Sequence, residues 1–203
     1  MPIRVCFIGD SFVNGTGDDE CLGWVGRACA AMRRTGNDVT CYNLGIRRDT
    51  TADVLRRWRQ EAEARLPPEH NSGLVFSFGA NDACLDDTGR AVRVPHEQSV
   101  VNARGILGTA RQWLPTLMVG PLPVGEADAD ARIAKLSASF GSLCASLNVP
   151  YLEVFHLAAD SHDWTGEAAA GDGAHPNTRG YARIAAAFSD WPAWRSWGDV
   201  TSS

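Results

Sequence analysis

The sequence contains no apolar run of the roughly 18 residues that a membrane-spanning helix needs, and no internal repeat or low-complexity linker. Its 203 residues are therefore expected to form one domain, 1–203. Basic residues are not in excess either, because 19 Lys and Arg stand against 24 Asp and Glu, for a net charge of −5. This balance argues against a nonspecific nucleic-acid binder. We therefore expect a protein that acts without a membrane or a nucleic acid.

Two further absences concern the cysteines and the start of the chain. The six cysteines form no C-x-x-C pair, which is the spacing of many zinc and redox sites. They lie mainly in apolar strand-like runs and on apolar helical faces, so we expect free thiols that pack as small hydrophobic side chains. The first residues lead directly into a short apolar segment without the longer apolar core of a signal peptide, which predicts a cytoplasmic location.

The pattern that is present is a regular alternation of short apolar runs and longer amphipathic stretches. The apolar runs cover residues 3–9, 39–44, 73–79, 116–120 and 150–155. Their near-continuous apolar character predicts an α/β fold in which a mainly parallel sheet lies between two layers of helices, as α/β/α. The Trp-rich segment 191–203 is predicted to be an irregular tail, which either caps the domain or contributes to a subunit contact in a homo-oligomer.

Reactive side chains follow the ends of the predicted strands, where ligands bind in open parallel sheets. Ser11 follows the first strand in Gly-Asp-Ser, and His175 lies in Asp-Gly-Ala-His-Pro before the last helix. A serine hydroxyl needs an adjacent base to act as a nucleophile, and histidine can be that base. Asp172 precedes His175 by three residues, so it can hold the Nδ1–H of the imidazole. These three residues are the candidate catalytic triad of an acyl-transfer site.

Two other strand-end loops contain groups that suit an oxyanion. Gly45 follows the second strand, and Asn81 follows the third. The backbone N–H groups of Ser11 and Gly45 and the side-chain amide of Asn81 are the predicted donors of an oxyanion hole. Asp10 and Asn14 flank the nucleophile and are predicted to support its loop. Each motif alone also fits a turn or a helix cap, but their coincidence at one edge of the sheet favours catalysis.

Together these motifs resemble the four sequence blocks of the SGNH hydrolases, also called GDSL esterases and lipases. The resemblance rests on Ser11 in Gly-Asp-Ser-Phe, Gly45 in Asn-Leu-Gly-Ile, Asn81 in Gly-Ala-Asn-Asp and His175 in Asp-Gly-Ala-His-Pro. One departure is Phe12, where the family's nickname has Leu. The resemblance implies a flavodoxin-like sheet of about five parallel strands. It also implies a serine esterase that forms an acyl-enzyme intermediate and needs no cofactor.

Two other kinds of function stay open. An acyltransferase, or a deacylase of carbohydrate esters or thioesters, would use the same triad. A noncatalytic module that binds a small ligand could also have a flavodoxin-like fold, although the segment after the first strand is not a glycine-rich phosphate cradle. The expected substrate of the esterase is a small or neutral carboxylic ester with a short acyl chain.

Further candidates lie in the loops. Four side chains of one predicted loop could hold a divalent metal: His156, Asp160, His162 and Asp163. Their spacing fits no common helical zinc motif, so no metal site is expected. Three loop arginines either recognise an anionic substrate or are simply solvated: Arg47, Arg48 and Arg90. Trp164 either lines the substrate pocket or anchors its loop, and loops 84–95 and 121–127 are predicted to set specificity.

Overall fold

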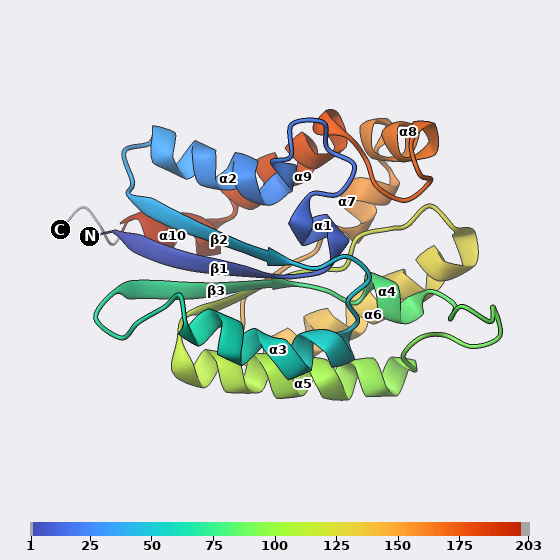
Figure 1. Cartoon of the computed structure of the whole chain (residues 1–203), viewed down its shortest axis with the longest axis horizontal. Helices are drawn as coiled ribbons and strands as arrows, with labels where there is room; N and C mark the ends of the chain where they lie inside the picture. Colours follow the sequence, from blue (N-terminus) through green and yellow to red (C-terminus); the bar gives the residue numbers. More distant parts are fainter. Residues whose placement is uncertain (1, 200–203) are drawn as a thin grey trace.

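The computed structural model describes residues 2–199, which form a five-stranded parallel sheet between two layers of helices (Figure 1). The strand order is β2-β1-β3-β4-β5, which is the flavodoxin-like order. The strands are β1 (Ile3–Gly9), β2 (Val39–Gly45), β3 (Asn71–Ser77), β4 (Thr116–Val119) and β5 (Tyr151–Leu152). Gly9 at the end of β1 lies opposite Gly45 of β2 and Ser77 of β3. The predicted three-layer α/β/α fold is confirmed.

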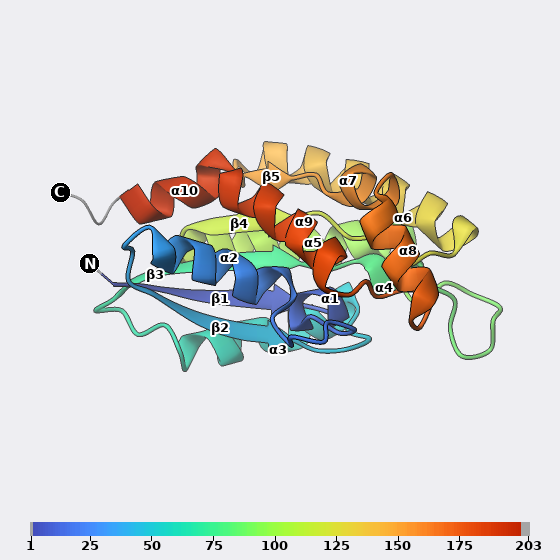
Figure 2. The same cartoon turned by 90° about the horizontal axis from the view of Figure 1, so that it is seen from above.

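Helices cover both faces of the sheet. They are α1 (Ser11–Asn14), α2 (Gly23–Arg34), α3 (Thr51–Glu63), α4 (Ala80–Ala83), α5 (His96–Trp113), α6 (Ala127–Ser146), α7 (Phe155–Ala159), α8 (His162–Ala170), α9 (Thr178–Asp190) and α10 (Pro192–Asp199). Figures 1 and 2 show α2, α9 and α10 over one face and α3, α5 and α6 over the other. Across residues 2–199, none of the helices has the length and apolar character needed to cross a membrane.

Each face of the sheet has its own hydrophobic core because successive side chains of a strand point to opposite faces. Phe7 of β1 packs on one side, where its ring meets Trp24 of α2 edge-on at 5.8 Å between centroids. Ile8 packs on the other side, in the cluster that contains Trp58 of α3 and Phe76 of β3. The burial of both faces explains why the strand sequences read as almost unbroken apolar runs.

The predicted bounds of the third and fifth strands were wrong by two or more residues, and those of the second and fourth by one. The third strand begins earlier, because Asn71 and Ser72 continue its pairing with β1 despite their polarity. It also ends earlier, because Gly79 takes a left-handed conformation with φ of 113° and is the N-cap of α4. The run 150–155 contributes only two residues to the sheet. Beyond them, the carboxylate of Glu153 accepts the backbone N–H of Phe155, and the chain turns into α7.

The Trp-rich tail is helical, so the prediction of an irregular segment was wrong. Pro192 is the first residue of α10, a position where proline is favoured because its missing N–H costs no helical hydrogen bond. Trp194 is buried, and its ring centroid lies 4.8 Å from that of Phe188 on α9 and 5.8 Å from that of Phe7. Through residue 199 the segment therefore covers one core of the domain. The remaining predicted tail residues, 200–203, lie outside the described residues.

Candidate active site

Ser11 is the first residue of the one-turn helix α1, and Asp10 alone separates it from the end of β1 at Gly9. Asp10 is the N-cap of this helix, and its carboxylate accepts the backbone N–H of Phe12 at 3.0 Å. Asn14 donates its backbone N–H to the Asp10 carbonyl at 3.1 Å, and its side-chain oxygen accepts from the Thr16 hydroxyl at 3.2 Å. Asp10 and Asn14 thus lie where the sequence placed them, on both sides of the nucleophile, and they fix the turn that presents Ser11.

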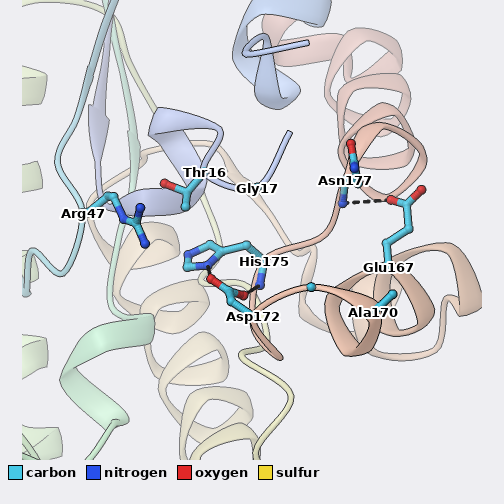
Figure 3. Close-up of a pocket in the computed structure, with 9 residues that line it drawn as sticks. Thr16, Gly17, Arg47, Glu167, Ala170, Asp172, His175 and Asn177 are labelled. Carbon is cyan, nitrogen blue, oxygen red and sulfur yellow. Dashed lines mark hydrogen bonds and ion pairs between the residues drawn. The ribbon is translucent and has the colours of Figure 1, made fainter. Parts of the chain in front are cut away.

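The side chains of Ser11, His175 and Asp172 form one continuous hydrogen-bonded chain. Ser11 Oγ lies 2.7 Å from His175 Nε2, and His175 Nδ1 lies 2.7 Å from Asp172 Oδ2. Figure 3 shows the Asp172 carboxylate directly against the imidazole. The ring of Phe12 packs on the imidazole, with 5.0 Å between centroids. The structure therefore brings together the three residues that the sequence predicted as a triad.

The carboxylate of Asp172 fixes which nitrogen of His175 faces the serine. Partial burial alone would raise the pKa of Asp172, but hydrogen bonds from the backbone N–H and imidazole of His175 and from the Ala174 N–H outweigh it and lower this pKa to about 2. An ionised carboxylate can only accept hydrogen bonds, so His175 Nδ1 carries the proton. His175 Nε2 is then the acceptor that faces Ser11 Oγ.

A buried carboxylate, Asp18, holds the His175 loop against the loop between α1 and α2. It accepts hydrogen bonds from the Arg27 guanidinium, from the backbone N–H of Gly23 and from the hydroxyl of Thr178 at the start of α9. Burial alone would raise the pKa of Asp18, but Arg27 and the backbone donors hold it well below its usual range. Gly17 has φ of 89°, and a Cβ there would lie 2.9 Å from that of His175. This close approach fixes the position of the histidine loop.

The three predicted oxyanion donors lie in different surroundings. The N–H of Ser11 belongs to the first turn of α1, where a helix supplies no acceptor of its own. The Asn81 amide donates to the Asp49 carbonyl at 3.0 Å, which leaves its second N–H available. The N–H of Gly45 donates to Asn43 Oδ1 at 3.0 Å, so it would have to share or leave this acceptor to bind an oxyanion.

Asn43 and Gly45 also join β2 to the nucleophile helix. Asn43 Nδ2 donates to the carbonyl of Val13 on α1 at 2.7 Å. A Cβ at position 45 would lie only 2.2 Å from the backbone nitrogen of Asn14, so glycine is required for this contact. No role was predicted for Asn43. The available signal was a polar amide near the end of an otherwise apolar strand.

A buried network, also missed from the sequence, joins the loop after β2 to the Asn81 segment. The carboxylate of Asp82 is fully buried and accepts both the backbone N–H of Thr51 at 2.8 Å and its hydroxyl at 2.6 Å. Asn102 of α5 donates to the same hydroxyl at 2.9 Å. Thr51 begins α3 directly after Thr50, which forms a capping box with Asp53. The network therefore sets the position of Asn81.

Asp10 is a buried acid beside the candidate nucleophile. Its side chain is only 2% exposed, and desolvation raises its pKa from an ordinary 3.8 to about 7, despite the hydrogen bond from Phe12. The nearby carboxylates of Asp82 and Asp49 add to the shift. The folded protein therefore binds a proton at Asp10 more tightly than the unfolded chain does. Its contribution lowers the free energy of unfolding progressively as pH rises from about 4 to 7.

We expect Asp10→Asn to remove this pH dependence, because asparagine can still cap α1 but cannot ionise. The free energy of unfolding of the variant should rise relative to wild type by on the order of 2 kcal/mol between pH 5 and pH 8. Urea unfolding at both pH values measures this difference. The matched control is Asp87→Asn, because Asp87 is 89% exposed and should show no such trend. A difference between Asp10→Asn and wild type that does not change with pH would contradict the prediction.

The remaining candidates from the sequence are Trp164, the segment 156–163, the cysteines and the loop 121–127. Trp164 is buried against Phe12 and Tyr181, so it anchors its loop. The predicted loop with His156 and His162 instead contains α7 and α8. Among residues 2–199, no three His, Cys, Asp or Glu side chains are grouped to hold a metal ion.

All six cysteines are free, as predicted. The 121–127 loop touches the histidine loop, since a Cβ at Gly125 would meet the Gly173 carbonyl.

A serine, a histidine and an aspartate linked in this way at the carboxyl edge of a parallel sheet are the arrangement of a serine hydrolase. Residues 7–183 match the GDSL-like Lipase/Acylhydrolase family, and the chain belongs to this family. It is therefore an enzyme of a family that hydrolyses ester bonds. A comparison with curated proteins gives no significant match.

Solved structures share the fold over nearly their whole length. A lipase/acylhydrolase from Enterococcus faecalis is 22% identical with a TM-score of 0.74, covering 95% of this chain and 96% of its own. An acetylxylan esterase from Geobacillus stearothermophilus is 18% identical with a TM-score of 0.77, covering 91% of both chains. The psychrotrophic esterase EstA from Pseudoalteromonas sp. is 20% identical with a TM-score of 0.70, covering 96% and 97%. At these identities the similarity establishes the fold.

Proposed function

We propose that this enzyme is a serine esterase that cleaves small carboxylic esters through an acyl-enzyme intermediate. One observation carries the proposal: Ser11 Oγ, the His175 imidazole and the Asp172 carboxylate are joined by two contacts of 2.7 Å each. The serine is thus already hydrogen-bonded to its base, and the base to the group that orients it, as nucleophilic catalysis requires. One of the similar solved structures is an acetylxylan esterase, and an acetyl substrate agrees with the small acyl group proposed here.

In the first half of the reaction, Ser11 Oγ attacks the ester carbonyl carbon while its proton passes to His175 Nε2. The bond between the carbonyl carbon and the leaving oxygen then breaks, and His175 returns the proton to that oxygen, which departs as the alcohol. Asp172 stabilises the imidazolium that exists between these two transfers. The negative charge on the former carbonyl oxygen is stabilised by the N–H of Ser11 and the free N–H of Asn81, with Gly45 as the third donor.

In the second half, water attacks the acyl-enzyme and gives a proton to His175 Nε2. The bond between the acyl carbon and Ser11 Oγ breaks, the proton returns to Oγ, and the carboxylic acid is released. The same oxyanion donors act in both halves.

The test combines ester hydrolysis with covalent labelling of the nucleophile. The Pseudoalteromonas esterase structure is described as inhibited by monoethylphosphonate, so an ethyl phosphonate ester is a suitable probe. We expect the protein to hydrolyse 4-nitrophenyl acetate and to be inactivated by the probe, with the added mass on the peptide that contains Ser11. Hydrolysis with labelling at another serine would contradict the assignment of the nucleophile. Absence of both hydrolysis and labelling would favour a noncatalytic binding module.

A further inference from the structure

A cavity of about 390 Å³ opens beside His175 and is lined by three parts of the chain. Thr16 and Gly17 come from the loop after α1, Arg47 from the segment after β2, and the third part runs from α8 to the start of α9 (Figure 3). His175 and Asp172 form part of this wall. The nucleophile Ser11 and the two other candidate oxyanion residues, Gly45 and Asn81, do not line it.

The acidic groups of this cavity are already occupied by donors from the protein. Glu167 accepts the backbone N–H groups of Asn177 and Gly180 and the guanidinium of Arg179. Burial alone would raise the pKa of Glu167, but these hydrogen bonds hold it below its ordinary value. Asp172 is committed to His175 and to the adjoining backbone. Neither carboxylate is free to attract a cation into the cavity.

Arg47 differs from the two carboxylates that line the cavity, because its charged group is unpaired in the described part of the chain. It makes no hydrogen bond or ion pair with any residue from 2 to 199, and Figure 3 shows its guanidinium directed across the cavity toward the His175 imidazole. Its neighbour Arg48, in contrast, is paired with Asp87 at 2.7 Å and does not line the cavity. A guanidinium presents a planar set of donors that matches a carboxylate or a phosphate. The cavity therefore offers an unpaired positive charge to whatever enters it.

The position of His175 indicates which half of an ester would enter. In the proposed function, His175 protonates the leaving oxygen, so the alcohol half must lie on its side of the scissile bond. The carbonyl oxygen points instead to Ser11, Gly45 and Asn81. We propose that Arg47 makes the enzyme selective for esters whose alcohol portion carries an anionic group, and this inference rests on the proposed function. It revises the expectation of a neutral substrate.

Two aryl acetates with the same acyl group test this selectivity: anionic 3-acetoxybenzoate and its neutral amide, 3-acetoxybenzamide. The measured quantity is the ratio of kcat/KM for the benzoate to that for the benzamide. We expect this ratio to be about 3 to 5 in wild type, since an ion pair with an exposed guanidinium such as that of Arg47 contributes a few-fold. Arg47→Gln should lower the ratio to about 1, and Arg47→Lys should give an intermediate ratio. Raising the salt concentration should lower the wild-type ratio, because screening weakens an exposed ion pair.

The matched control is Arg48→Gln, which removes the same charge one residue away and should keep the wild-type ratio. An equal ratio in wild type and Arg47→Gln, or a wild-type ratio near 1, would overturn the inference while the proposed function stands. If wild type hydrolyses neither ester and the phosphonate does not label Ser11, the proposed function fails, and the inference fails with it. The two failures therefore give different results.

Discussion

Replacement of Ser11 by alanine is expected to lower kcat/KM for 4-nitrophenyl acetate by at least about 10⁴-fold. The variant lacks the oxygen that would form the acyl-enzyme, so the remaining oxyanion donors and His175 can assist only direct attack by water. The fold should be retained, because the substitution removes the contact of Ser11 Oγ with His175 but no backbone hydrogen bond. Alanine is also the residue most favourable to a helix. We expect the Tm to stay within about 3 °C of wild type.

The control for Ser11→Ala is Ser142→Ala. Ser142 is exposed on α6, and within residues 2–199 its hydroxyl donates only to the carbonyl of Ala138 in the same helix. This variant should keep wild-type kcat/KM and wild-type labelling by the phosphonate. Retention of more than a tenth of the activity in Ser11→Ala, with the protein folded, would remove Ser11 from the mechanism.

The second large effect is expected for Asp172→Asn, with a fall in kcat of about 10³- to 10⁴-fold. Asparagine keeps the shape and the Oδ1 acceptor that holds the N–H groups of Ala174 and His175, so the loop should stay in place. Its amide, however, donates a hydrogen bond to Nδ1 of the imidazole. The imidazole proton then moves to Nε2, which can no longer accept the proton of Ser11.

Steady-state kinetics with 4-nitrophenyl acetate measure this effect, and KM should change much less than kcat. The control is Asp163→Asn, since Asp163 lies on α8 near Arg179 and outside the triad. A kcat within threefold of wild type in a folded Asp172→Asn variant would show that another group orients His175.

Local patterns in the sequence were sufficient to predict most of the fold. The apolar runs predicted the strands because both faces of the sheet are buried. The end of the third strand could not be placed, because the left-handed turn at Gly79 depends on its packing against Phe140 of α6. The helix α10 was missed for the same reason. Its Trp194 is buried by Phe7 and Phe188, contacts that a short local pattern does not reveal.

The residues of the candidate site also fall into two groups, those that local motifs predict and those whose roles depend on contacts distant in sequence. Ser11, Asp172 and His175 could be predicted because they occur in short motifs at strand or helix ends. Asn43 and Asp82 could not, because their roles depend on contacts with Val13 and Thr51 that are distant in sequence. Nor could the sequence distinguish Arg47 from Arg48, since only the folded chain pairs one with Asp87 and leaves the other facing the cavity.

The contact between Ser11 and His175 joins residues 164 positions apart, so it also limits when activity can appear during synthesis. A ribosome that adds roughly 5–20 residues per second needs roughly 10–30 s to extend the chain from the serine to the histidine. Throughout that time the nucleophile has no base. The histidine loop is then held by Asp18 and by α9, which must emerge and pack before the triad closes. Esterase activity in a translation reaction would therefore report completion of the C-terminal helices rather than formation of the sheet.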